Sequence, residues 1–166
     1  MTKTKKLALL AALTAVALTI FVAEAQIPPV VPVPGVKLGL ANIVTLVTMA
    51  LLGRREAGAV LVVRLILGSA FAGGFSGLMF SAVGGAAAYI VMCLLIKVFP
   101  EKLMWVVSVL AALAHNAGQL AVAVWVSGSA SMLYYGTVLA AAGVITGVFT
   151  GFGAMYLTRA AKKLVK

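Results

Sequence analysis

The sequence contains no aspartate, and its only acidic residues are Glu24, Glu56 and Glu101. All three fall at the expected ends of apolar segments, so no pair of carboxylates is available for acid–base catalysis within a membrane. The lack of aspartate also excludes the carboxylate-rich Mg²⁺ sites that diphosphate chemistry requires. We therefore expect that the protein is not an enzyme.

The sequence also lacks the residues that form common metal and nucleotide sites. With one histidine and one cysteine, the chain has too few ligands for a typical zinc site. It has no GxxxxGK[ST] loop with which to bind ATP. Cys93 has no second cysteine with which to form a disulfide. We expect neither a metal ion nor a cofactor.

What the chain has in abundance is apolar sequence. Apolar residues make up 64% of the 166 residues and charged residues 10%, against about 45–50% and about 25% in soluble domains. The apolar runs are continuous, whereas membrane barrels alternate in strands of about ten residues. At about 20 residues per span, the sequence predicts an all-α integral membrane protein with a single domain over 1–166.

We expect a bundle of six transmembrane helices. Their approximate ranges are 7–23, 36–52, 57–72, 78–98, 103–126 and 133–157. The long apolar stretch after residue 56 is divided at the glycines of 73–77, where turns are easily formed. Residues 26–37 contain four of the five prolines, which predicts an extended connection, because proline cannot continue a helix.

The first apolar run has two possible interpretations. Basic residues precede it, and Ala23-Glu24-Ala25 resembles the cleavage site of a secretory signal peptide. Alternatively, it is a retained helix whose small residues, four apart, allow another helix to approach closely. Residues of this kind are Ala8, Ala11, Ala12 and Ala15. The sequence leaves both interpretations open.

The net charge of +10 does not indicate nucleic-acid binding, because the basic residues lie in short clusters between apolar runs. With six helices and both termini in the cytoplasm, every basic residue except Lys37 and Arg64 falls on the cytoplasmic side. This is the distribution that the positive-inside rule predicts, and it indicates a multi-pass protein of the cell membrane.

Polar residues in the fifth helix indicate where a site would lie. His115, Asn116 and Gln119 have helical spacing, so they lie on or beside one face. Asn42 is expected at the same depth, in the outer half of the membrane, with Lys37 just above it. Polar groups at this depth usually face protein or a water-filled cavity and mark a site. A small-molecule pocket beneath residues 28–37 is one interpretation, and hydrogen bonding between helices is the other.

Arg64 is a less certain member of this set. It is expected nearer the cytoplasmic side, where its guanidinium either reaches the surface along its apolar stem or contributes to the pocket. A positive charge at Lys37, Arg64 or His115 would suit an anionic group, whereas the apolar walls would suit a ring or a prenyl chain.

Three segments resemble a bacterial membrane family. They are PGVKLGLANI at 34–43, RLILG at 64–68 and HNAGQ at 115–119. The family is called the Gx transporter family, or heptaprenyl diphosphate synthase component I. It is similar to the substrate-binding S components of energy-coupling factor (ECF) transporters, six-helix proteins that capture a small molecule on the outer side.

The resemblance implies a vitamin-like, isoprenoid-related or flavin-related ligand and partnership with an ECF T subunit and two ATPases. It also implies that the small residues of the first helix, Ala8, Ala11, Ala12 and Ala15, dock on the T subunit. Two alternatives remain. One is a non-catalytic accessory subunit of an isoprenoid, quinone or flavin-based electron-transfer system. The other is a membrane enzyme that uses His115 as a base.

Overall fold

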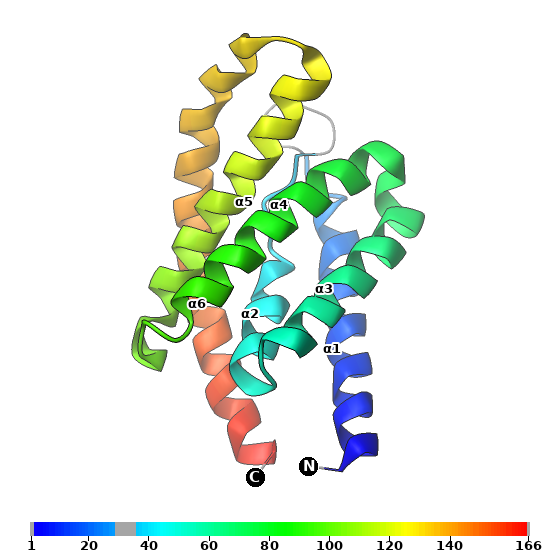
Figure 1. The fold of residues 1–166 in the computed structure, drawn as a ribbon, viewed down its shortest axis with the longest axis vertical. Helices are drawn as coiled ribbons and strands as arrows, with labels where there is room; N and C mark the ends of the chain where they lie inside the picture. Colours follow the sequence, from blue (N-terminus) through cyan, green and yellow to red (C-terminus); the bar gives the residue numbers. More distant parts are fainter. Residues whose placement is uncertain (1, 29–35, 166) are drawn as a thin grey trace.

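The computed structural model describes residues 2–28 and 36–165, and in these residues all regular secondary structure is helical (Figure 1). The long helices are α1 (Lys3–Glu24), α2 (Asn42–Leu51), α3 (Arg54–Gly68), α4 (Gly74–Leu95), α5 (Met104–Ser127) and α6 (Gly136–Val165). Short helical turns connect them: η1 (Ser69–Gly73), η2 (Glu101–Leu103) and η3 (Ala130–Tyr135). The all-α prediction is confirmed.

Four stretches are long and apolar enough to cross a membrane: α1, α4, α5 with η2, and α6 with η3. The protein is therefore a multi-pass membrane protein. The other two helices are shorter, with 10 residues in α2 and 15 in α3. An α2 of this length rises only about 15 Å, so it spans at most half of a bilayer core of about 30 Å.

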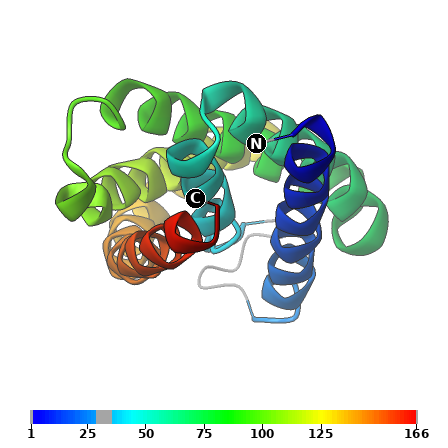
Figure 2. The same cartoon turned by 90° about the horizontal axis from the view of Figure 1, so that it is seen from below.

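The helices surround α2, which contacts each of the other five. Viewed from the end where both termini lie, α1 and α6 flank α2 on opposite sides, and α3 and α4 lie along a third side, at the top of the view (Figure 2). The α2–α3 and α4–α5 turns also lie at this end (Figure 1). Most of the basic residues are therefore gathered at one end of the bundle.

Ion pairs connect the segments at this end. Lys6 of α1 pairs with Glu56 in the first turn of α3. Glu101 pairs with Lys162 and Arg159 of α6, the latter at 3.7 Å. These side chains are partly exposed, and surface ion pairs of this kind contribute little to stability. The bundle is held together mainly by its apolar packing.

The closest helix contact is between α5 and α6, and it depends on the glycines of α6. A Cβ atom on Gly147 would lie 2.6 Å from the Cα of Val109, and one on Gly151 would lie 2.5 Å from the Cα of Trp105. Neither position has room for a side chain. With Gly143, these glycines form a GxxxGxxxG stripe, which packs within this chain as small-residue stripes do between membrane helices.

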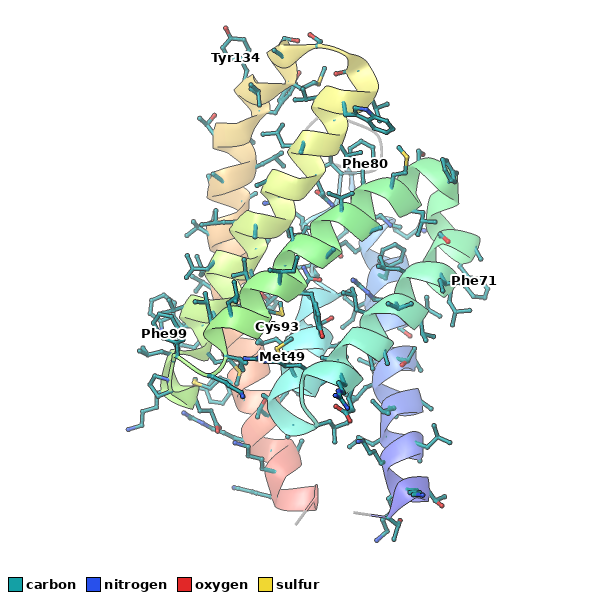
Figure 3. The ribbon with its side chains drawn as sticks, in the orientation of Figure 1. Met49, Phe71, Phe80, Cys93, Phe99 and Tyr134 are labelled. Carbon is teal, nitrogen blue, oxygen red and sulfur yellow. The ribbon has the colours of Figure 1, made fainter. Side chains whose placement is uncertain are left out.

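Large apolar side chains cover the outside of the bundle. Phe71 projects away from the helices (Figure 3) and is 70% exposed. Phe75, Ile145 and Phe149 are exposed to a similar degree. A soluble monomer rarely exposes so much apolar surface. Hydrocarbon solvates these side chains without cost, so this surface suits a lipid environment.

Several predicted helix ends are wrong. Helix α1 begins at Lys3, before the predicted start at residue 7. Helix α6 ends at Val165, beyond the predicted end at residue 157. Hydropathy marks where a helix enters lipid, whereas basic side chains allow it to continue into water. Helices α3 and α4 each begin about one turn earlier than expected. The predicted break lies at Gly73–Gly74, where Gly74 has a positive φ of 56°.

The largest error concerns the second helix, predicted over 36–52. Residues 36–41 are not helical, and α2 begins only at Asn42. Gly39 adopts a φ of +78°, a conformation that glycine adopts without strain and that a helix does not permit. The proline-rich connection predicted over 26–37 lies mostly outside the described residues.

Candidate functional site

Residues 36–51 form the second crossing of the bundle, with an extended segment over 36–41 and helix α2 over Asn42–Leu51. Non-helical backbone is tolerated at membrane depth only where protein or a cavity surrounds it, because its N–H and C=O groups need partners. In transporters, interrupted helices of this kind usually mark the binding site. The polar groups around residues 36–41 are therefore the first place to look for a site.

Buried side chains bind the backbone of this segment. Lys37 donates its backbone N–H to Oε1 of Gln119, at 3.2 Å. Gly39 and Leu40 donate theirs to the two carboxylate oxygens of Glu24, at 2.5 and 3.0 Å. Gln119 lies about 22 Å along an α5 of about 36 Å, so the extended segment reaches well into the bundle.

His115 is the centre of a hydrogen-bonded polar cluster. Its Nδ1 lies 3.3 Å from the side-chain amide of Asn42, and its Nε2 lies 3.0 Å from Nε2 of Gln119. His115 is 3% exposed and Gln119 is fully buried. The structure thus brings together Asn42, His115 and Gln119, three of the residues that the sequence placed at one level.

The bonds of Gln119 determine which nitrogen of His115 carries the proton. Oε1 of Gln119 accepts from the backbone of Lys37, so its NH₂ group must face Nε2 of His115 and donate to it. Nε2 therefore carries no hydrogen, and the neutral ring is protonated at Nδ1. An Nδ1–H needs an acceptor, so the Asn42 amide, whose Nδ2 is placed against Nδ1, bonds to this tautomer only when it is turned to present its oxygen.

Glycines enclose this cluster on several sides. A Cβ atom on Gly39 would lie 2.9 Å from Cδ2 of His115, and one on Gly84 of α4 would lie 2.9 Å from Cε1 of the same ring. The imidazole is thus held between two backbones that approach too closely for any side chain. In this conformation the polar groups bind one another, and a ligand would have to replace some of these bonds.

Asn116 is oriented differently. Its Nδ2 donates to the backbone carbonyl of Leu139 in α6 at 2.7 Å, and a Cβ on Gly143 would lie 2.8 Å from the same nitrogen. Its Oδ1 has no partner in the part of the chain described. Asn116 therefore joins α5 to α6 beside the cluster and makes no bond with His115.

Arg64 does not extend to the membrane surface; that interpretation is wrong. The residue is 3% exposed, and its Nε and Nη2 have no hydrogen-bond partner among residues 2–28 and 36–165. Its guanidinium carbon lies 5.6 Å from the centre of the Phe21 ring. The Lys37 ammonium lies 3.5 Å from the same ring centre. Lys37 and Arg64 thus meet at Phe21, next to the extended segment.

Sequence reasoning missed the part that Glu24 plays. It treated this glutamate as a segment end or as part of a cleavage site, yet Glu24 is 4% exposed and binds Gly39 and Leu40. Arg64 and Lys37 are its cationic neighbours. A glutamate at the end of an apolar run, close to the proline-rich connection, was the available signal.

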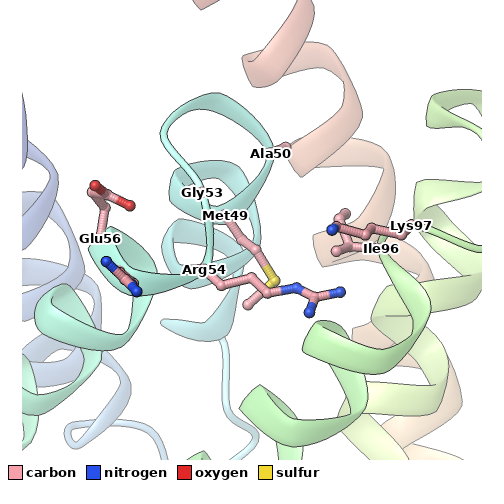
Figure 4. Close-up of a pocket in the computed structure, with 8 residues that line it drawn as sticks. Met49, Ala50, Gly53, Arg54, Glu56, Ile96 and Lys97 are labelled. Carbon is pink, nitrogen blue, oxygen red and sulfur yellow. The ribbon is translucent and has the colours of Figure 1, made fainter.

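The small residues predicted to dock a partner, Ala8, Ala11, Ala12 and Ala15, are all exposed on α1. At the same end of the bundle, a groove of about 540 Å³ opens between the α2–α3 turn and the end of α4 (Figure 4). Arg54 extends across it beneath Met49 toward Ile96 and Lys97 (Figure 4). This groove contains none of the predicted ligand-binding residues.

The described residues contain no group of three His, Cys, Asp or Glu side chains that could hold a metal ion. Chemically, the cluster around His115 can bind hydrogen-bonding groups, and the pair of cations at Phe21 can bind negative charge.

Comparison with known proteins identifies the family to which the chain belongs. No curated protein and no solved structure matches the chain. A family model described as heptaprenyl diphosphate synthase component I matches residues 13–157, a range that runs from the middle of α1 to α6 and includes every residue of the polar cluster. The chain therefore belongs to the heptaprenyl diphosphate synthase component I family.

Proposed function

We propose that this protein is the substrate-binding S component of an ECF-type importer. In this role it captures a small vitamin-like, isoprenoid-related or flavin-related molecule from the outer side of the cell membrane. The observation that carries the proposal is the interrupted second crossing, whose extended half bonds to buried polar side chains of α1 and α5. A scaffold has no need of such a break, whereas a transporter uses one to form a site.

The polar cluster supplies the chemistry for ligand binding. Few polar groups within an apolar surrounding are typical of small-molecule sites. Asn42, His115 and Gln119 offer both donors and acceptors, and their present partners are one another. A ligand with an amide-like or hydroxyl-bearing ring would exchange these bonds for its own. Asn116 would act by holding α6 against α5 beside the ligand.

The orientation follows from the charges. Basic residues gather at the end that holds both termini (Figure 1), and by the positive-inside rule that end is cytoplasmic. All six helices then cross or enter the bilayer, and the extended segment 36–41 faces the outer half. Substrate would enter from outside, and the chain would act without enzyme activity of its own.

An S component needs partners that hydrolyse ATP, and the chain has no phosphate-binding loop. We propose a T subunit and two ATPases. The exposed face that contains Ala8, Ala11, Ala12 and Ala15 suits the docking of a helix, because small side chains allow close approach in lipid.

Affinity isolation of the full chain from its native membranes tests this proposal. The expected result is recovery of a T subunit and two ATPases with the wild type, and a loss of about tenfold or more with Ala12→Trp. Ile145→Trp is the matched control, since Ile145 is 71% exposed on α6 and should leave recovery unchanged. Recovery of a prenyl synthase or a redox protein in place of these partners would contradict the proposal and favour the accessory-subunit alternative.

A further inference from the structure

Two cations lie inside the bundle, and neither forms an ion pair within residues 2–28 and 36–165. Arg64 is almost fully buried, and the Lys37 ammonium is buried although the rest of that residue is half-buried. The ion pairs of the described residues are those of Glu56 and Glu101 at the other end of the bundle. Burying a charge is costly unless it is paired and hydrogen-bonded, so these two groups require an explanation.

Neighbouring groups compensate for only part of this charge. The Phe21 ring lies against both cations and stabilises them through its negative face. Glu24 supplies one negative charge nearby, but its two oxygens accept bonds from the backbone of Gly39 and Leu40. His115 is neutral, because its Nε2 accepts a hydrogen bond from Gln119. One uncompensated positive charge remains.

The unpaired donors are suited to an anion. Nε and Nη2 of Arg64 and Nζ of Lys37 have no partners in the described ranges. A guanidinium presents its N–H groups as a planar fork that fits a carboxylate or phosphate, and an ammonium adds a third donor from a flexible stem. Because Glu24 cancels one of the two charges, a singly charged group balances the site, whereas a doubly charged group leaves it negative.

We propose that Lys37 and Arg64 bind a singly charged carboxylate or phosphodiester group of the transported molecule. This inference rests on the proposed function and narrows it to anionic substrates. The anion site adjoins the polar cluster through Lys37, whose backbone bonds to Gln119. A ligand with its anionic group at Arg64 would therefore place its neutral part toward His115. Glu24 is a positioning residue that holds segment 36–41 and limits the charge the site accepts.

Thermal unfolding of the purified full chain in phosphatidylcholine nanodiscs tests the site. The probes are acetate and dimethyl phosphate, each singly charged, with sulfate as the doubly charged probe, all at constant ionic strength. At about 100 times Kd, a singly charged probe should raise the unfolding temperature by about 5–10 °C. Arg64→Gln and Lys37→Gln should weaken the apparent affinity at least tenfold. Lys163→Gln, an exposed cation on α6, should behave as the wild type.

Glu24→Gln gives a result that a merely structural role would not produce. It raises the charge of the site by one, so sulfate should bind at least tenfold more tightly than it does to the wild type. Arg64→Lys preserves the charge without the fork and should restore part of the affinity if Arg64→Gln folds poorly. Equal responses of the wild type, Arg64→Gln and Lys37→Gln to every probe would overturn the anion site.

A second arm separates the two sources of an anion. Stabilisation by phosphatidylglycerol in the nanodiscs, lost in Arg64→Gln and absent with the soluble probes, would identify a lipid headgroup and overturn assignment to the transported molecule. The proposed function fails by a different result, the absence of a T subunit in the affinity isolation. The two failures are therefore distinguishable.

Discussion

Replacing Glu24 by alanine should release the extended half of the second crossing. The carboxylate makes two charge-assisted bonds to backbone N–H groups, at 2.5 and 3.0 Å, in a position that is 4% exposed. Hydrogen bonds to charged groups contribute about 1.5–3 kcal/mol each. The substitution leaves two buried N–H groups without acceptors and removes the nearest anion from Arg64 and Lys37. We expect the free energy of unfolding to fall by about 3–5 kcal/mol.

Two measurements test this prediction. The first is the unfolding midpoint of purified Glu24→Ala against the wild type. The second is hydrogen exchange of the Gly39 and Leu40 amides, which should be at least 100-fold faster in the variant while the amides of α5 stay protected. Glu101→Ala is the control, because it removes partly exposed ion pairs and should cost under about 1 kcal/mol. Equal effects of the two substitutions would refute the idea that Glu24 holds the segment.

Two further predictions concern the packing of the site and the end of the bundle that holds the termini. Gly84→Ala would place a methyl group 2.9 Å from Cε1 of His115 and should destabilise the protein by about 1–3 kcal/mol. Gly77→Ala on the same helix meets nothing within 4 Å and should be neutral or stabilising, so equal unfolding midpoints for the two variants would contradict the packing argument. The hydrogen bond from Lys6 lowers the pKa of Glu56 below its usual range, so this pair stabilises the fold above the ordinary glutamate pKa and loses its effect as the pH falls through the lowered value. The difference in unfolding midpoint between wild type and Glu56→Gln should therefore disappear as acidification protonates Glu56, and a difference that persists once this carboxyl is protonated would show that charge at Glu56 is not the cause.

Hydropathy and helical spacing predicted much of the fold. Continuous apolar runs identified each helix. The spacing of His115 and Gln119, together with the depth of Asn42, placed three residues at one level, and the structure joins them by hydrogen bonds. These features are local or depend only on distance along a helix, so the sequence carries them directly.

The remaining features depend on contacts between distant segments. The break before Asn42 is stabilised by Glu24 of α1 and Gln119 of α5, and no local pattern in 36–41 reveals those partners. Counting residues along α3 alone placed Arg64 too far from the site, because such a count takes no account of how the helix packs. Burial of Glu24 was missed because an acidic residue at a helix end is usually exposed.

Native mass spectrometry of the purified full chain shows whether the cluster around His115 binds a small molecule. We expect a retained small molecule on the wild type and on Ser108→Ala, a matched change on α5 that removes a buried hydrogen bond to Thr150. We expect His115→Ala to lose that molecule while the protein remains folded. If folded His115→Ala retained the same molecule, the cluster would not be the binding site.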